Sequence, residues 1–208
     1  MYDSTRSIRD FLAGTAARQP TPGGGSVTAL VGGLAAALGE MVVNYSIGKK
    51  GLEAFEDELR PAAAELAKAR EVLLELMVED QAAYEALSSA RKLPKDSKER
   101  QEKIPAALLA CIRVPQAIAA TGVRVLEKFD ALVSFVNPYL LSDLAVSADL
   151  AMATIRCAIY SVRANAKDVT DPGDRQSIEA SVSQILNRAL TLIQSVAPRV
   201  WERYNQNG

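Results

Sequence analysis

Histidine is absent from this chain of 208 residues. Its absence excludes His-based catalytic triads, metal sites with imidazole ligands and imidazole acid–base catalysis. Any proton transfer must therefore use Asp, Glu, Lys, Tyr or Ser side chains, or backbone dipoles. The carboxylates show neither the spacing of an EF-hand nor the Glu-x-x-His spacing of a di-iron bundle, so no metal and no separate cofactor is expected.

Cysteine is almost as scarce, with Cys111 and Cys157 alone. They lie far apart in apolar stretches, and their spacing fits no metal or redox motif, so both are predicted to be buried thiols. The first ten residues lack a basic segment followed by an apolar core, the pattern of a signal peptide. Reduced cysteines without an export signal predict a cytoplasmic protein.

Excess charge is also lacking, because 24 basic residues nearly balance 25 acidic ones. The molecule has no overall field to attract a polyanion, and no nucleic-acid partner is expected. Residues 27–43 carry a single charge, Glu40, but they are rich in Ala and Gly and fall short of the roughly 20 strongly apolar residues that span a bilayer. We therefore expect no membrane partner and predict a central helix buried on all sides.

Helical periodicity dominates the rest of the chain, and no alternating strand pattern stands out. Pro105 and Pro115 are placed at or near helix starts, where a missing N–H is harmless. The prediction is an all-α, single-domain bundle of long helices spanning residues 1–208. The small residues of the helix over 27–43 favour a homodimer whose subunits pack through it.

One glycine-rich loop precedes that helix, Pro20-Thr21-Pro22-Gly23-Gly24-Gly25-Ser26. Two prolines and three glycines exclude a regular helix or strand, and Ser26 is a plausible N-cap. The loop can present backbone N–H groups to an electron-rich ligand at the helix N-terminus, or it can be a tight connector. It is not a Walker A loop, and composition leaves both interpretations open.

Four polar residues stand out elsewhere. Asp80 interrupts an apolar helical face beside Tyr84. Lys49 follows the apolar helix, Asp143 lies near a helix start and Asn165 lies near a helix end. Each of the last three also has a structural interpretation, as a dipole partner or a helix-end group.

Together these segments resemble the cyclodeaminase/cyclohydrolase family, whose members act on one-carbon derivatives of tetrahydrofolate. The glycine-rich loop is similar to the family's most distinctive motif. Later family motifs recur in the same order and at similar spacing over nearly the whole chain: Asp80-x-x-x-Tyr84, Leu93-Pro94-Lys95, Asn137 with Ser142-Asp143, and Asn165 with Asp168-Val169-Thr170-Asp171.

The family includes the deaminase half of formiminotransferase-cyclodeaminases and stand-alone bacterial methenyltetrahydrofolate cyclohydrolases. Residues 47–50 and 165–167 look more like the cyclohydrolases, whereas residues 168–171 are closer to the deaminase. The resemblance implies hydrolysis of 5,10-methenyltetrahydrofolate to 10-formyltetrahydrofolate. Two alternatives stay open: a formiminotetrahydrofolate cyclodeaminase that releases ammonia, and a non-catalytic folate-binding homologue.

The resemblance also implies roles for individual residues. Asp80 would stabilise the cationic substrate, Asp143 would be the second carboxylate and proton carrier, and Lys49 would contact the pterin or act as an acid. Lys92 and Lys95 are weaker candidates for contacting the glutamate tail. The residues expected to bind substrate are Pro22, Gly23, Gly24, Gly25, Ser26, Tyr84, Asn137, Ser142 and Asn165.

The sequence departs from the family pattern in one place. Tyr160 and Ser161 stand where an Asn-Val pair after small residues is usual, and Arg156-Cys157 replaces a commoner small-residue pair. The added bulk and charge are expected to alter the pocket or to abolish activity.

Overall fold

The computed structural model describes residues 1–206 and consists there of helices, without a strand. This confirms the all-α prediction. Two 3-10 turns, Glu53–Phe55 and Pro138–Leu140, precede the third and fifth helices. The α-helices are α1 Ile8–Ala16, α2 Gly24–Asn44, α3 Glu56–Lys92, α4 Lys98–Leu132, α5 Leu141–Ala166 and α6 Pro172–Gln206.

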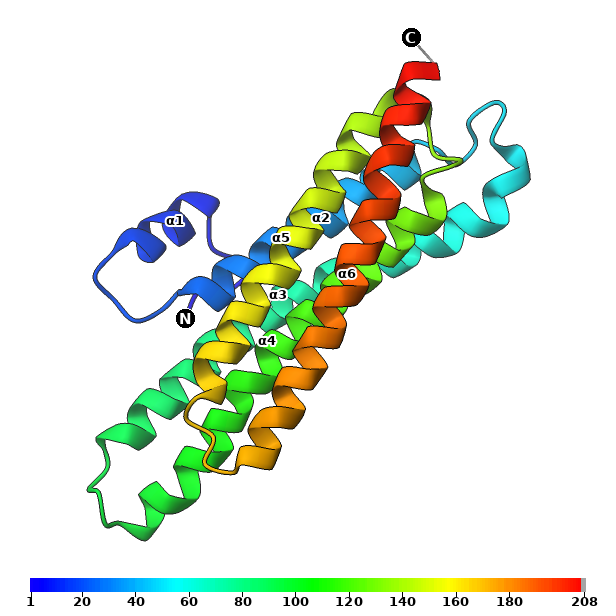
Figure 1. The fold of residues 1–208 in the computed structure, drawn as a ribbon. Coiled ribbons are helices and arrows are strands. Elements are labelled where there is room, and N and C mark those ends of the chain that lie inside the picture. Colours follow the sequence, from blue (N-terminus) through cyan, green and yellow to red (C-terminus); the bar gives the residue numbers. More distant parts are fainter. Residues whose placement is uncertain (207–208) are drawn as a thin grey trace.

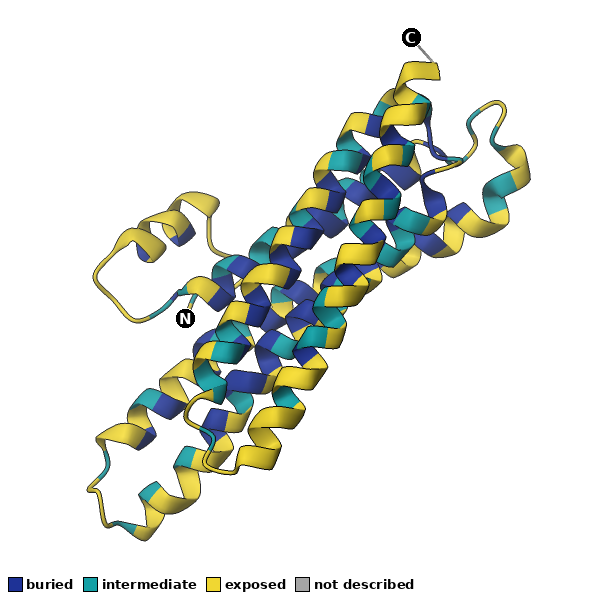
Figure 2. Cartoon of the chain, viewed as in Figure 1, coloured by how far each residue is buried: buried dark blue, intermediate teal, exposed yellow. Residues whose placement is uncertain are grey.

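Four of these helices form a ring in which α2 packs on α3, α3 on α4, α4 on α5 and α5 on α2. The sixth helix, α6, lies along α4 and α5, as Figure 1 shows. Large apolar side chains such as Phe129, Leu126 and Ile155 are fully buried between the helices, and the exposed residues in Figure 2 lie mainly on the outside. Hydrophobic burial along the shared faces therefore holds the bundle together.

Small residues let α2 approach its neighbours closely. A Cβ atom on Gly39 would lie 2.3 Å from the Phe129 ring, and one on Gly32 would lie 2.9 Å from Cγ2 of Thr154. Neither position accepts a larger residue without movement of its neighbour. The second contact also fixes the alignment of α2 and α5, because it places Gly32 and Thr154 at the same height along the bundle.

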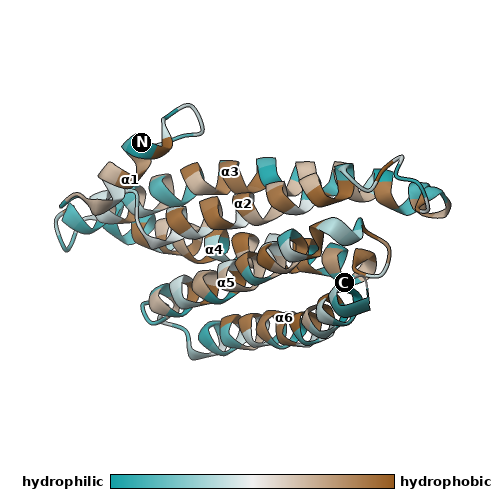
Figure 3. Cartoon of the chain, turned by 90° about the horizontal axis from the view of Figure 1, so that it is seen from above, coloured by the Kyte–Doolittle hydropathy of each residue, from teal (hydrophilic) through white to brown (hydrophobic). Residues whose placement is uncertain are grey.

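The prediction that residues 27–43 are buried on all sides is wrong for the single chain. An apolar stripe runs along one face of α2, and its central residue, Leu34, is 53% exposed. Hydrophobic residues recur along α2 in Figure 3. Half-buried side chains continue the stripe on either side of Leu34: Val27, Leu30, Val31, Leu38 and Met41.

Three stretches are long and apolar enough to cross a membrane by length and composition alone. They are α2, α4 and the segment Pro138–Ala166, and roughly half of the residues in each most apolar window are buried inside the bundle. Packing against the other helices accounts for the buried apolar residues without a lipid bilayer. The absence of a membrane partner stays a prediction.

Ser7 caps α1 by accepting a hydrogen bond from the Asp10 N–H. Two local expectations from the sequence meet different outcomes. Cys111 is buried but Cys157 is exposed, because it lies on the outer face of α5, so that prediction is half wrong. Pro105 and Pro115 lie inside the continuous helix α4 and do not start helices.

Candidate active site

The carboxyl group of Asp80, on α3, packs directly against the first turn of α2. The Ser26 hydroxyl donates a 2.8 Å hydrogen bond to Oδ2 of Asp80. A Cβ atom on Gly25 would lie 2.0 Å from Oδ1, so only glycine lets the carboxylate come this close. The glycine-rich loop thus presents its helix N-terminus to a side chain of the same chain.

Burial and hydrogen bonding act on Asp80 in opposite directions. Burial disfavours the charged form and raises the pKa of the carboxyl above its ordinary value, while the Ser26 hydroxyl and backbone N–H pull the pKa back down. The effect of burial is the larger one, so the pKa of Asp80 is raised above its ordinary value. A carboxyl with a raised pKa gives up and takes back a proton nearer to neutral pH, which suits acid–base chemistry.

The loop itself follows the predicted path with one correction. Pro22 follows a cis peptide bond and is buried. Gly23 is the N-cap of α2, and Gly24 is the first residue of the helix. A Cβ atom on Gly24 would have no other atom within 4 Å. Ser26 is therefore not the N-cap, since its hydroxyl is turned to Asp80 and not to the helix backbone. It is fully buried in this role.

Asn165 lies at the same end of the bundle as Asp80. Its Nδ2 donates 3.0 Å hydrogen bonds to the Cys111 and Ser161 carbonyls, and no described residue donates to its Oδ1. Burial first, and then the nearby charge of Asp80, raise the pKa of the Cys111 thiol, so the thiol stays protonated at neutral pH. Arg91 acts in the opposite sense on that thiol and pairs with Asp168.

The other predicted residues at this end are more exposed. Tyr84, one helical turn after Asp80, is 47% exposed, and Lys92 and Lys95 are exposed at the tip of the α3–α4 hairpin. One edge of this end therefore offers two half-buried polar groups, Asp80 and Asn165, beside exposed residues that a substrate can reach.

A second group of predicted residues lies where α2 ends and α5 begins. The Asn137 N–H donates a 2.8 Å hydrogen bond to the Ser46 hydroxyl, and its Nδ2 donates to the Tyr45 carbonyl. Its Oδ1 accepts from the Tyr139 N–H, so the Asn137 side chain braces this end of the bundle. Lys49 Nζ lies 5.0 Å from the Tyr139 ring centroid, in a cation–π contact.

Ser142 and Asp143 occupy the first turn of α5 at this same end. Ser142 is exposed and Asp143 is half-buried. Among the described residues, neither Asp143 nor Asp80 forms an ion pair. The Asp80 carboxylate accepts a hydrogen bond from Ser26, whereas no described residue donates one to the Asp143 carboxylate. Both α5 residues are free to meet a ligand.

The length of α2 separates the two groups. Asp80 contacts the start of α2, whereas Asn137 contacts the residues just after its end. A helix of 21 residues is about 30 Å long at 1.5 Å per residue. Within one chain, the structure therefore does not bring Asp80 together with Lys49 or Asp143.

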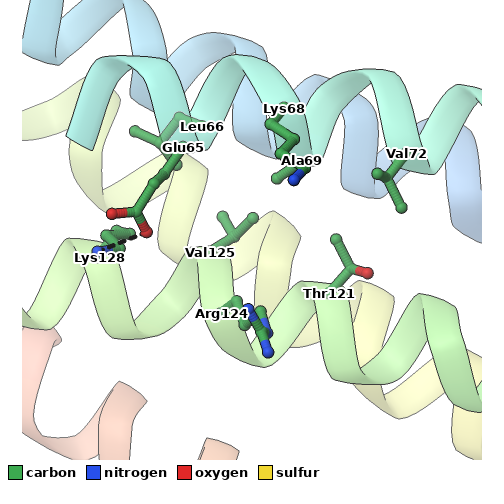
Figure 4. Close-up of a pocket in the computed structure, with 9 residues that line it drawn as sticks. All are labelled: Glu65, Leu66, Lys68, Ala69, Val72, Thr121, Arg124, Val125 and Lys128. Atoms are coloured by element: carbon green, nitrogen blue, oxygen red, sulfur yellow. Dashed lines mark ion pairs between the residues drawn. The ribbon is translucent and has the colours of Figure 1, made fainter. Parts of the chain in front are cut away.

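Five grooves among residues 1–206 lie away from the predicted site residues. Their volumes are about 340 to 460 Å³, and none of the five is lined by a predicted site residue. The groove in Figure 4, about 410 Å³, runs between α3 and α4. Its basic residues are Lys68, Arg124 and Lys128, and Lys128 is paired with Glu65 at 2.6 Å.

Comparison with known protein families shows which family the chain belongs to. The family model described as formiminotransferase-cyclodeaminase matches residues 7–184. The chain belongs to this family. The predicted family is thereby confirmed, while the roles of the loop before α2, of Asp80 and of Asn165 stay predictions.

The relatives of this family member include proteins named as cyclohydrolases and proteins named as cyclodeaminases. The methenyltetrahydrofolate cyclohydrolase of Methylorubrum extorquens is 34% identical over 79% of this chain and 81% of its own length. The formimidoyltransferase-cyclodeaminase of Sus scrofa is 31% identical over 95% of this chain, which spans 37% of that longer protein. The structure of formiminotetrahydrofolate cyclodeaminase from Thermotoga maritima superposes with a TM-score of 0.83 at 28% identity, covering 97% of each chain.

Sequence reasoning missed the charges around Cys111. That residue was assigned a packing role only, and Arg91 was grouped with a charged connector, although Asp80 and Arg91 both lie close enough to the Cys111 thiol to shift its pKa. Arg91 adjoins the Lys92 to Lys95 motif and Asp168 begins the motif after Asn165. Their ion pair links the two motifs, a contact that neither motif shows alone.

Proposed function

We propose that this chain is a methenyltetrahydrofolate cyclohydrolase, which hydrolyses 5,10-methenyltetrahydrofolate to 10-formyltetrahydrofolate. The observation that carries the proposal is the 34% identity to the Methylorubrum extorquens cyclohydrolase over most of both chains. Asp80, held by Gly25 and Ser26 with a raised pKa, supports it with a group suited to the chemistry.

The reaction needs an anionic neighbour and a proton carrier. Water adds to the cationic carbon between N5 and N10 and forms a tetrahedral intermediate; the C–N5 bond then breaks, N5 is protonated and one proton is released overall. In its ionised form Asp80 stabilises the cation and takes the proton of the attacking water. Its raised pKa then favours returning a proton to N5 as the C–N bond breaks.

The remaining residues have supporting roles in this proposal. The free Oδ1 of Asn165 accepts a hydrogen bond from the substrate and orients it. Asp143 supplies a second carboxylate and Lys49 contacts the pterin, as the family resemblance implies. The substrate is the folate derivative itself, with no metal or additional cofactor, and the site of action is the cytoplasm.

A cyclodeaminase is the second candidate, and one observation favours it. The Thermotoga maritima cyclodeaminase matches over nearly the full length of both chains. Its reaction closes N10 onto a formimino carbon and expels ammonia, and it passes through a similar tetrahedral carbon. The same carboxyl can therefore serve either reaction.

The proposal includes a homodimer. The apolar stripe of α2 around Leu34 is uncovered in the single chain, and burying it would remove a continuous hydrophobic surface from water. A second copy of the chain offers a surface of the same kind and length.

Two assays with one protein preparation test the function. The loss of methenyltetrahydrofolate absorbance is followed against a blank without enzyme, because the substrate also hydrolyses unaided. Ammonia release is measured with 5-formiminotetrahydrofolate. The proposal predicts a loss well above the blank and little ammonia; ammonia release alone would assign the cyclodeaminase, and neither signal would indicate the non-catalytic homologue.

A further inference from the structure

We propose that Arg91 recognises the glutamate carboxylate of the folate substrate, and that the benzoyl ring of the substrate lies along α3 between Asp80 and Arg91. A tetrahydrofolate derivative carries this glutamate beyond N10, on the side away from the pterin. The inference rests on the proposed function, because it takes the reacting carbon to lie at Asp80. It adds a specificity: the site prefers folates to pteroates, which lack the glutamate.

Asp80, Tyr84 and Arg91 lie on one face of α3. At 3.6 residues per turn, the eleven residues from Asp80 to Arg91 make three turns and about 20°. By the same count, Tyr84 lies about 40° from Asp80 and stands between the two along the helix. Lys92, the next cation, lies about 120° from Asp80 and so belongs to another side of α3. Arg91 is therefore the cation in line with Asp80.

The spacing along α3 fits the length of the substrate. Eleven residues rise about 16 Å, and the Arg91 side chain can lean back toward the helix N-terminus by about 6 Å. Its guanidinium can thus lie roughly 10 Å beyond Asp80 along the helix. The extended path from the bridging carbon through N10, the benzoyl ring and the amide to the first carboxylate also spans roughly 10 Å at ordinary bond lengths.

Tyr84 offers a surface for the middle of the substrate. Its side chain belongs to an exposed residue, 47% accessible, one helical turn beyond Asp80. An aromatic ring at this position can pack against the benzoyl ring in an offset or edge-to-face contact. The face of α3 therefore presents a carboxyl, a ring and a guanidinium in the order in which the substrate presents its cationic carbon, its ring and its carboxylate.

The Arg91 guanidinium is held in place and still has donors to offer. Its Nη2 donates to Oδ2 of Asp168, on the turn between α5 and α6, which lies beside α3 in Figure 1. Within residues 1–206 no group accepts a hydrogen bond from its Nε or Nη1, and the side chain is 49% exposed. A guanidinium binds a carboxylate through two parallel N–H donors. Asp168 is thus a positioning residue for Arg91.

The surrounding charge favours an anion at this end of α3. Residues 91–103 include six basic and three acidic side chains, although the whole chain carries a net charge of −1. Arg100 donates to the carbonyls of Arg91 and Leu93, and it has no ion-pair partner among the described residues. This second guanidinium adds positive charge next to Arg91 without taking its free donors.

The contact is tested by removing each partner in turn. Wild type and Arg91→Gln are assayed with 5,10-methenyltetrahydrofolate and with 5,10-methenyltetrahydropteroate, which lacks the glutamate. Removing the glutamate should lower the kcat/KM of wild type by about 10- to 100-fold, the usual range for a hydrogen bond to a charged group. Arg91→Gln should lose a similar factor on the folate and almost nothing on the pteroate.

The loss should appear mainly in KM, because the carboxylate lies far from the reacting carbon and binds equally in the ground state and the transition state. Asp168→Asn should raise KM for the folate alone, since it releases Arg91. Lys98→Gln, which removes an exposed charge at the start of α4, should change neither substrate. Equal losses on both substrates in Arg91→Gln would show a structural role and overturn the proposal, as would no loss on either.

Arg91→Lys keeps the test decisive if Arg91→Gln fails to fold. A lysine preserves the charge but not the two parallel donors, so it should give an intermediate loss confined to the folate. The wild-type preference for the folate, unchanged in a folded Arg91→Lys protein, would overturn the role of the guanidinium.

Binding without turnover separates this inference from the proposed function. Calorimetry compares tetrahydrofolate with tetrahydropteroate on wild type and Arg91→Gln. If wild type hydrolyses neither substrate but binds the folate more tightly, and Arg91→Gln removes that difference, the function is wrong and the carboxylate contact stands. If wild type is active but binds both compounds equally, the function stands and the contact is wrong.

Discussion

The Ser26 hydroxyl donates a 2.8 Å hydrogen bond to the Asp80 carboxyl, although 54 residues separate the two in the sequence. The bond joins the first turn of α2 to the middle of α3. It places a carboxylate at a helix N-terminus, where the helix dipole favours negative charge, while burial disfavours that charge. The balance between these effects sets the pKa of Asp80, and several predictions depend on it.

Gly25→Ala is expected to destabilise the fold by about 1 to 3 kcal/mol, because its Cβ would overlap the Asp80 carboxyl. Activity should fall with the displaced carboxyl. Gly24→Ala is the matched control, since no atom lies within 4 Å of its Cβ. Thermal unfolding and kcat/KM of both variants check the prediction, and equal behaviour of the two would contradict it.

Ser26→Ala should shift the acid limb of the kcat/KM profile to higher pH. The hydroxyl stabilises the ionised carboxyl, so its removal raises the pKa of Asp80 further. Thr28→Val removes a nearby hydroxyl that bonds the Gly24 carbonyl, and it should leave the limb in place. A shift to lower pH, or the same shift in both variants, would refute this account of Asp80.

Asp80→Asn should raise the melting temperature at pH 7.5. Burial raises the pKa of Asp80 above its unfolded value, so the folded state binds the proton more tightly. Its contribution to stability is fully present below the unfolded pKa and is lost as the pH rises through the folded pKa. The amide removes that loss while it can still accept the Ser26 hydrogen bond.

The gain should shrink as the pH falls and disappear below about pH 4, the ordinary range for aspartic acid, where both proteins are uncharged at this position. Calorimetry from pH 3.5 to 8 measures it. An Asp80→Asn protein that is less stable than wild type at pH 7.5 would show that the ionised carboxyl is satisfied in the fold.

Cys157 should react faster than Cys111 with a thiol reagent in the native protein. Cys157 is exposed on α5, whereas Cys111 is buried inside the bundle. Burial also raises the pKa of the Cys111 thiol, which lowers its thiolate fraction. Labelling rates followed by mass spectrometry distinguish the two thiols, and equal rates would contradict the burial of Cys111.

The helices could be predicted from the sequence because apolar periodicity and capping are local. The positions of Pro105 and Pro115 inside a helix could not be predicted. A proline in a helix interior destabilises the helix by about 3 kcal/mol, so each of the two is expected at a helix boundary. Pro115 is buried in the packed face of α4, where tertiary contacts hold the helix together through it.

The site could be predicted only in part. The family motifs single out Asp80, Gly25 and Ser26, and the structure brings these three residues into contact. It could not reveal that Lys49 and Asp143 lie at the far end of the bundle, because motif spacing does not encode the end of the bundle that a residue occupies. The exposed thiol of Cys157 was missed for a related reason: an apolar stretch does not say which of its faces is covered.

The most direct test is the rate of methenyltetrahydrofolate hydrolysis by wild type and Asp80→Asn, each above the blank at neutral pH. Loss of a proton carrier at the reacting carbon is expected to lower kcat/KM by about 10² to 10⁴-fold while circular dichroism stays native. Wild-type hydrolysis that disappears in a folded Asp80→Asn protein is the predicted result. Equal rates in the two proteins would contradict the central role of Asp80.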